Sequence, residues 1–311
     1  MVSTMLSPGS STRCFSPRLD AVDAPSHAAL LDPSWAIGKH AFLSLHALRR
    51  RGHTEVDPII RRVPYQWQGF GFQDHDDQAY ALLHNSAGGF VEGDAAELHV
   101  VADPGTRALF TTTAATKFYK CEAGETSHDL ASFSVGEEAL LEYLPDEVIP
   151  FAASRIERTT RFSLHPASRL FASDVISAGR IRYGAGELFA FASLRSQFEL
   201  RINGRLVVLD RLVAPGAEEA AALGRLWGGR LHLATVAAYA PSLPDSLVER
   251  VQERCEALAD HCDAGATMVD GVIVTRVLAE QVWQVHEAVY SIWETVRPAI
   301  AGKPARRIRK P

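Results

Sequence analysis

A chain of 311 residues with 47% hydrophobic and 22% charged residues has the composition of an ordinary globular protein with a sizeable core. Its net charge of −5 argues against a general nucleic-acid binder, which would carry a basic field, and no apolar run approaches a membrane span. The four cysteines form no Cys-x-x-Cys pair, so a reducing cytoplasm is their simplest location.

The N-terminal segment, residues 1–33, is rich in Ser, Pro and small side chains and lacks the continuous apolar stretch of a signal peptide. We expect a disordered extension there, because such a composition buries too little apolar surface to fold. A single β-rich domain is expected over residues 34–311.

Two strand-like segments follow, residues 41–45 and 56–60, on either side of a polar turn at residues 49–53. Beyond them, Asp74-His75-Asp76-Asp77 combines carboxylates with an imidazole, which could ligate a metal ion. Adjacent residues in one polar loop rarely converge on one ion, so we interpret this segment as a solvated turn.

A glycine-rich block, Gly88-Gly89-Phe90-Val91-Glu92-Gly93-Asp94, marks backbone that turns tightly or approaches another group closely. It lacks the Gly-Lys-Ser/Thr ending that binds phosphate and Mg²⁺, so the chain is not a P-loop nucleotidase. The next apolar segments, residues 97–101 and 107–112, flank the turn Asp103-Pro104-Gly105, which predicts a hairpin.

Alternating and apolar runs predict further strands at residues 130–135, 139–144, 156–164 and 169–177. The strongest hairpin signal joins residues 197–202 to residues 205–210 through Asn203-Gly204.

Two helices are predicted late in the chain, over residues 245–261 and 278–300, because apolar residues recur there at three- and four-residue spacing. Cys255 and Cys262 share one face of the first, with His261 beside them. A soft-metal site is one interpretation, but small cysteines in a helix stripe favour core packing.

Four blocks of sequence are similar in content and order to one known family. They are Gly88–Asp94, Thr111–Tyr119, Leu141–Phe151, and Gly179-Arg180 with Gly186-Glu187-x-Phe189. From about Trp35 to its end, the chain resembles the urease accessory protein UreD family, also called UreH. The resemblance implies a mainly β fold, an irregular β-helix-like stack of sheets with two α-helices near the C-terminus.

The resemblance also implies a function. Members of this family are non-catalytic scaffolds that bind UreF, which recruits the GTPase UreG, and the complex sits on the urease apoprotein while nickel is inserted. No tightly bound cofactor is expected, only nickel in transit through an internal passage. We therefore expect UreF, UreG and apo-urease as partners, a cytoplasmic location, and neither nucleic acid nor membrane as a ligand.

Acidic residues inside apolar strands are the positions that point to a functional site. Burying a carboxylate without a partner costs several kcal/mol, roughly, so each needs a cation, water or an exposed face. One interpretation is that they pair with Lys117, Arg180 or backbone amides and serve the fold. The other is a file of oxygen ligands that hands on hydrated Ni²⁺ without holding it tightly.

The candidate site residues carry these two roles. The nickel-passage candidates are Asp94, Thr116, Glu142 and Asp174. The partner-docking candidates are Lys117, Tyr119 and Arg180.

Two other functions stay open on the sequence. One is a stand-alone hydrolase that uses a buried carboxylate pair such as Glu142 and Asp174, although no nucleophile elbow, zinc-protease or dinucleotide motif accompanies it. The other is a metal store built on His and Cys, against which the scattered positions of those residues argue.

Overall fold

The computed structural model describes residues 40–73, 77–308 and 310. The predicted N-terminal extension, residues 1–33, lies outside the described residues. So do Asp74, His75 and Asp76 of the acidic loop, whose remaining member, Asp77, lies 3.3 Å from the guanidinium of Arg49.

The described chain forms two β-sheets. The first has seven strands in the order β14-β13-β11-β8-β5-β1-β2. Their bounds are β1 (His40–Arg50), β2 (His53–Arg62), β5 (Ala95–Ala102), β8 (Ser127–Val135), β11 (Arg155–Leu164), β13 (Ser193–Ile202) and β14 (Arg205–Ala214).

The second sheet has ten strands, eight of them in the order β16-β17-β15-β12-β9-β6-β4-β3, with β10 and β7 attached beside β12. Their bounds are β3 (Tyr65–Gly71), β4 (Ala79–Asn85), β6 (Arg107–Thr112), β7 (Thr116–Phe118), β9 (Leu140–Leu144), β10 (Val148–Pro150), β12 (Arg169–Ser177), β15 (His232–Tyr239), β16 (Asp263–Val269) and β17 (Val272–Ala279).

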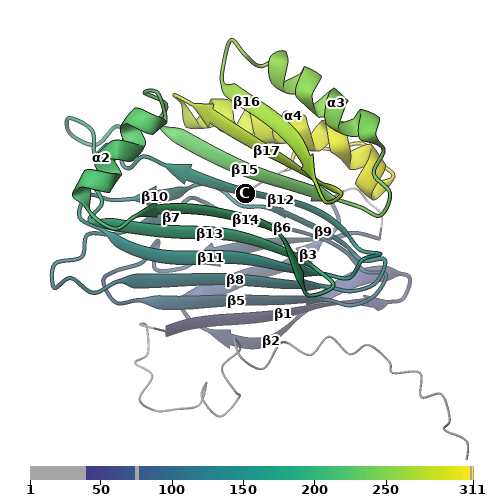
Figure 1. The fold of residues 1–311 in the computed structure, drawn as a ribbon. Coiled ribbons are helices and arrows are strands. Elements are labelled where there is room, and N and C mark those ends of the chain that lie inside the picture. Colours follow the sequence, from purple (N-terminus) through teal and green to yellow (C-terminus); the bar gives the residue numbers. More distant parts are fainter. Residues whose placement is uncertain (1–39, 74–76, 309, 311) are drawn as a thin grey trace, which may run out of the picture. The chain divides into compact units, whose positions relative to one another are not determined.

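The chain winds between the two sheets. From β5 to β13 it passes repeatedly from the first sheet to the second and back, so that β5, β8, β11 and β13 are parallel neighbours. In the second sheet β4, β6, β9 and β12 are likewise parallel. Each winding therefore lies on the one before it, as Figure 1 shows for the first sheet, and the expected β-helix-like stack is confirmed.

The space between the sheets holds the main core. Because side chains alternate across a strand, every second residue of each strand enters it. Phe133, Phe162 and Phe198 come from three successive parallel strands, and their rings lie 4.9 and 5.4 Å apart between centroids. Tyr143 reaches them from the second sheet, with its ring centroid 4.6 Å from that of Phe133. Stacked windings thus place like side chains above one another.

Three helices complete the described fold: α2 (Ala217–Leu226), α3 (Asp245–Glu256) and α4 (Val282–Ala301). Helices α3 and α4 cover the outer face of the second sheet near β15 and β17 (Figure 1), where their apolar stripes form a second core. Helix α4 begins with a capping box between Gln281 and Gln284 and ends at Gly302 in the left-handed conformation. Among the described residues, no helix is both long and apolar enough to cross a membrane.

Most of the elements predicted from the sequence are present in the structure. Strands β13 and β14 form the hairpin expected at Asn203-Gly204, and both turn residues have positive φ (51° and 78°). Both late helices exist, and Cys255 and Cys262 are buried in the core that they share. Helix α2 was not predicted from the sequence.

The hairpin predicted over residues 97–112 is wrong. Strand β5 pairs with β1 and β8 in the first sheet, whereas β6 pairs with β4 and β9 in the second. The turn at Asp103-Pro104-Gly105 therefore carries the chain from one sheet to the other. A Pro-Gly turn reverses the chain in either case, and only the long-range pairing decides whether the two strands bond to each other.

One glycine is required by its surroundings. Gly179 has a φ of +148°, and a Cβ built there would lie 1.9 Å from the carbonyl oxygen of Glu187. We expect Gly179→Ala to lower the free energy of unfolding by more than about 2 kcal/mol, since both the backbone and the clash are strained.

Gly265, in β16, provides the matched control. Its φ is not positive and a Cβ there would meet nothing within 4 Å. Gly265→Ala is expected to be neutral or slightly stabilising. Urea unfolding of both variants measures the difference, and equal midpoints would contradict the assignment of strain to Gly179.

Candidate functional site

A cavity of about 110 Å³ lies between the two sheets. Its walls come from the inner faces of both, with Leu98 and Ala131 on one side and Leu83 and Tyr143 on the other. A cavity of this volume has room for several water molecules, which need roughly 10–15 Å³ each on this measure. The interior of the fold is therefore able to hold water and polar solutes.

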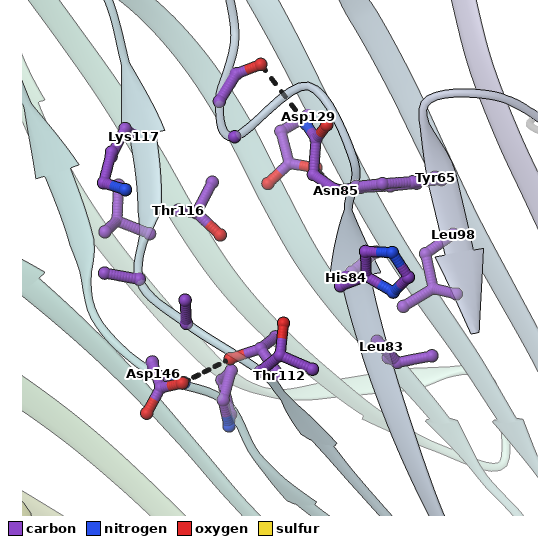
Figure 2. A pocket seen from close by; sticks show the side chains of 18 of the residues that line it. Tyr65, Leu83, His84, Asn85, Leu98, Thr112, Thr116, Lys117, Asp129 and Asp146 are labelled. Atoms are coloured by element: carbon purple, nitrogen blue, oxygen red, sulfur yellow. Dashed lines mark hydrogen bonds between the residues drawn. The ribbon is translucent and has the colours of Figure 1, made fainter. Parts of the chain in front are cut away.

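Two of the sequence blocks meet at this cavity. Phe90 donates its backbone N–H to the carbonyl of Lys117 (2.8 Å), and Tyr119 donates to the carbonyl of Phe90 (2.8 Å). Gly88 and Gly89 line the cavity opposite Lys117, and a Cβ on Gly89 would lie 2.5 Å from the Lys117 carbonyl oxygen. Figure 2 shows Thr116 and Lys117 on one side of this space and His84 and Asn85 on the other. The glycines are thus explained by close backbone approach at the cavity.

A buried group of charges forms the inner wall. Arg158, on β11, donates to Oδ2 of Asp174 (2.7 Å) and to Oγ of Ser196 (3.0 Å). Its Nε lies 4.0 Å from Oδ2 of Asp129, whose Oδ1 accepts a hydrogen bond from the Tyr65 hydroxyl (2.7 Å). Asp129 and Ser196 are the register partners of Arg158 on the two flanking strands, so the parallel pairing itself aligns this row.

The electrostatics of this group favour the acceptance of positive charge. It contains two carboxylates, Asp129 and Asp174, against the single guanidinium of Arg158. Burial raises the pKa of Asp129, and the attraction of Arg158 opposes that rise only in part. Burial would lower the pKa of Arg158, but the carboxylate of Asp174 raises it above its usual value. Arg158 is therefore always charged, and one carboxylate is left in surplus.

Two of the four passage candidates line the cavity. Asp174 projects from the inner face of β12, and Thr116 lies at the start of β7. The carboxylate of Asp94 instead accepts the backbone N–H of Val91 (2.8 Å) and closes the turn that ends the glycine-rich block.

Glu142 lies on the opposite face of the second sheet. In β9, Leu141 and Tyr143 face the core between the sheets, whereas Leu140 and Leu144 face the helices, and Glu142 follows the latter. Consequently Glu142 and Asp174, which projects inward, do not come together as a pair.

The carboxylate of Glu142 is fully enclosed and strongly hydrogen-bonded. Its Oε1 accepts from Nε1 of Trp293 (2.6 Å) and Nε of Arg297 (3.0 Å). Its Oε2 accepts from Nη2 of Arg297 (3.1 Å) and from the side chain of Gln78. Arg297 is thus its cation, rather than Lys117 or Arg180, and the network fastens α4 to the centre of the second sheet.

The docking candidates gather at a separate groove of about 510 Å³, lined by both Lys117 and Arg180. The Arg180 guanidinium lies over the rings of Phe151 (4.0 Å) and Tyr183 (3.7 Å) and bonds to Glu187. Tyr119 packs edge-on against the same Phe151.

Large aromatic side chains stay exposed at this groove. Tyr183 is 60% exposed and Trp283, also in the lining, is 54% exposed. Exposed Tyr and Trp beside Arg are the residues that most often dominate protein–protein binding. The groove has the composition of a protein-binding surface.

Asp129, Arg158 and Tyr65 were not predicted from the sequence as site residues. The signal for Arg158 was present, because Ile156, Thr160 and Phe162 alternate with it along one face of a predicted strand. An arginine at an inward-facing position of such a strand calls for a buried carboxylate. Asp129 stood one residue before the strand predicted at 130–135, so it was not counted as inward-facing.

Comparison with known proteins points to one family. The family model for the UreD urease accessory protein matches residues 39–310. The chain is 30% identical to the urease accessory protein UreD of Pseudomonas fluorescens over 288 residues, which is 92% of this chain and 98% of that one. It is 29% identical to urease accessory protein UreD 2 of Brucella abortus over 279 residues, 87% of this chain and 91% of that one.

The Glu142 network generates a stability prediction. Arg297→Met leaves the Glu142 carboxylate buried without its cation, so we expect a loss of about 3–5 kcal/mol in the free energy of unfolding. Arg307→Met is the control, because Arg307 pairs with Glu287 on the surface, where both side chains are more than half exposed. It should cost at most about 1 kcal/mol. Urea unfolding at pH 7 compares them, and similar losses would argue against a structural role for the network.

The raised pKa of Asp129 generates a pH prediction. The folded state binds a proton at Asp129 more readily than the unfolded state does, so this group's contribution to stability falls as pH rises from its unfolded pKa through its raised folded pKa. Asp129→Asn does not titrate and still accepts from Tyr65. The stability of the variant relative to wild type should therefore increase as pH rises through that window.

Asp270→Asn controls for the loss of an acid, because Asp270 pairs with Arg205 at the exposed surface. Its stability relative to wild type should not rise with pH. The measurement is the urea midpoint at several pH values between 4.5 and 7.5. A constant difference for Asp129→Asn would show that Asp129 titrates as an ordinary carboxyl.

Proposed function

This chain belongs to the UreD urease accessory protein family, and on that premise we propose that it acts as a non-catalytic scaffold that aids nickel insertion into apo-urease. It does so with UreF and the GTPase UreG, which we propose as its partners in the cytoplasm. Nickel is the cargo of this complex, not a resident cofactor of the chain.

The cavity with its surplus carboxylate is the observation that carries the proposal. A hydrated Ni²⁺ ion needs a polar, water-holding route whose ligands bind it weakly enough to release it. Asp174 and Asp129 supply carboxylate oxygens on the cavity wall, and Thr116 supplies a hydroxyl. Among the described residues, the cavity lining includes no cysteine, and thiolate ligands would hold a borderline metal far more tightly.

Asp174 and Thr116 are therefore our foremost passage residues, joined by Asp129. Asp94 and Glu142 stay predictions from the resemblance, since each carboxylate already accepts hydrogen bonds that serve the local fold. For Glu142 a role in fastening α4 accounts for all of its contacts with Arg297 and Trp293.

The groove beside Arg180 supports partner docking. Lys117 lines both the groove and the cavity, so a protein seated in the groove would lie next to the proposed route. We propose that Lys117, Tyr119 and Arg180 belong to this docking surface. The hydrolase alternative gains no support, because Glu142 and Asp174 lie on opposite faces of one sheet.

The test is urease activation in cells that carry the urease genes and the accessory genes. Deletion of this chain should abolish urease activity and the nickel content of purified urease, and the wild-type chain should restore both. Asp174→Asn should restore them several-fold less well, because the one remaining carboxylate, that of Asp129, then only balances Arg158, while the side chain at position 174 keeps its size.

Asp270 is an exposed aspartate that pairs with Arg205 and does not belong to the cavity lining, so Asp270→Asn should restore both fully. Each variant is first shown to accumulate to the wild-type level. Nickel-loaded, active urease in the absence of this chain would overturn the proposal and reduce the family likeness to one of fold.

A further inference from the structure

A cluster of metal-ligating side chains lies where neighbouring residues of one loop line the cavity and the docking groove. Asp146 and Glu147 follow each other in the loop between β9 and β10, and Asp146 lines the cavity whereas Glu147 lines the groove. His286 approaches them from α4, with Nε2 2.9 Å from Oε2 of Glu147. One loop and one helix, far apart in sequence, thus converge on one point.

The spacing of these three side chains suits one metal ion. One ligand atom from each of Asp146, Glu147 and His286 lies within 4.8 Å of the other two. Two ligands bound to one ion at about 2.1 Å are at most about 4.2 Å apart, so small side-chain rotations close the set. The side chains are 20%, 17% and 28% exposed, which leaves the cluster sheltered but open to ions from solution.

Backbone and side-chain contacts hold the cluster in place. The carbonyl of Glu147 accepts the N–H of Thr116 (2.9 Å), and Asp146 receives a hydrogen bond from the Thr112 hydroxyl (3.1 Å), seen in Figure 2. Only side-chain rotation is needed to bind an ion, because the loop itself is already fixed. Such preorganisation lowers the free-energy cost of binding.

A cation of the protein already rests on the cluster. The ammonium of Lys310, near the chain's end, lies 2.6 Å from Oδ1 of Asp146. It supplies positive charge beside two adjacent carboxylates, but a lysine tip that is a quarter exposed is held only by a partly screened ion pair. A divalent ion with three protein ligands is the stronger partner for these oxygens.

We propose that Asp146, Glu147 and His286 form a divalent-cation site in which the metal displaces the ammonium of Lys310. One imidazole and two carboxylates suit borderline ions of the nickel and zinc class rather than Mg²⁺ or Ca²⁺. The choice of nickel as cargo rests on the proposed function, whereas binding itself is a property of the isolated chain. A metal held here would stand between the interior route and the partner surface.

The experiment is calorimetric titration of NiCl₂ into the purified, tag-free full-length chain at pH 7.5. We expect His286→Ala to weaken the wild-type affinity at least about tenfold, because the loss of a residue that merely supports a metal ligand already costs about 10–100-fold and His286 is a ligand itself. Lys310→Met should strengthen it several-fold, because the competing cation is gone. Opposite shifts from two residues of one cluster distinguish a metal site from a general loss of structure.

His128→Ala is the matched control. His128 also lies beside a carboxylate, that of Glu157 at 3.8 Å, but it belongs to no cluster of three ligands among the described residues. It should leave the affinity unchanged. Thermal unfolding confirms that each variant is folded before titration.

Two results would overturn the site: equal affinity in wild type and His286→Ala, or weaker binding in Lys310→Met. These outcomes are separable from those of the urease test. If His286→Ala loses nickel affinity but the wild-type chain fails to activate urease, the site is upheld and the proposed function is overturned. If His286→Ala keeps the wild-type nickel affinity and the wild-type chain activates urease, the site is overturned and the proposed function is upheld.

Discussion

The parallel stacking of successive windings is the constraint on which this structure depends. Each strand from β5 to β13 takes its backbone hydrogen bonds from the winding before and the winding after, so register is inherited from one winding to the next. That inheritance puts Asp129, Arg158 and Ser196 side by side although 67 residues of sequence separate the first from the last. The same stacking aligns Phe133 with Phe162. The polar row and the aromatic row are therefore two products of one geometric rule, and a slip of one residue would turn both rows to the outer face.

The sequence predicted what is encoded locally. Alternation identified most strands, Asn203-Gly204 identified a hairpin, and the four family blocks led to the mainly β stack that the structure confirms. The pairing of β5 and β6 was wrong because the Pro104-Gly105 turn looks the same whether the chain stays in its sheet or leaves it. The cavity was half predicted: Thr116 and Asp174 were chosen, but Asp129 and Tyr65 became meaningful only through partners on other windings. Long-range register, not residue type, decides which buried polar groups meet.

One sheet carries two polar systems that differ in how completely they are satisfied. On its outer face Glu142 is enclosed by donors from Gln78, Trp293 and Arg297, an arrangement that fixes a helix and gives both carboxylate oxygens hydrogen-bond partners. On its inner face Asp174 shares Arg158 with a second carboxylate beside water-sized space. Buried carboxylates with a full complement of partners serve stability, whereas the transport role that we propose for Asp174 depends on a carboxylate in surplus beside a cavity. The alternation of side chains across β-strands keeps the two systems apart.

The Glu142 network also has a consequence for the order in which parts of the chain fold. Arg297 follows Glu142 by 155 residues, so the counter-charge for the middle of the second sheet is synthesised well after the carboxylate that it pairs with. Until it arrives, β9 would bury an uncompensated carboxylate, and the sheet cannot close around it at acceptable cost. The outer apolar face of the second sheet is therefore expected to stay uncovered until α4 docks. The second sheet therefore needs α4 for its stability. Chains that lack α4 are expected to be substrates for proteolysis.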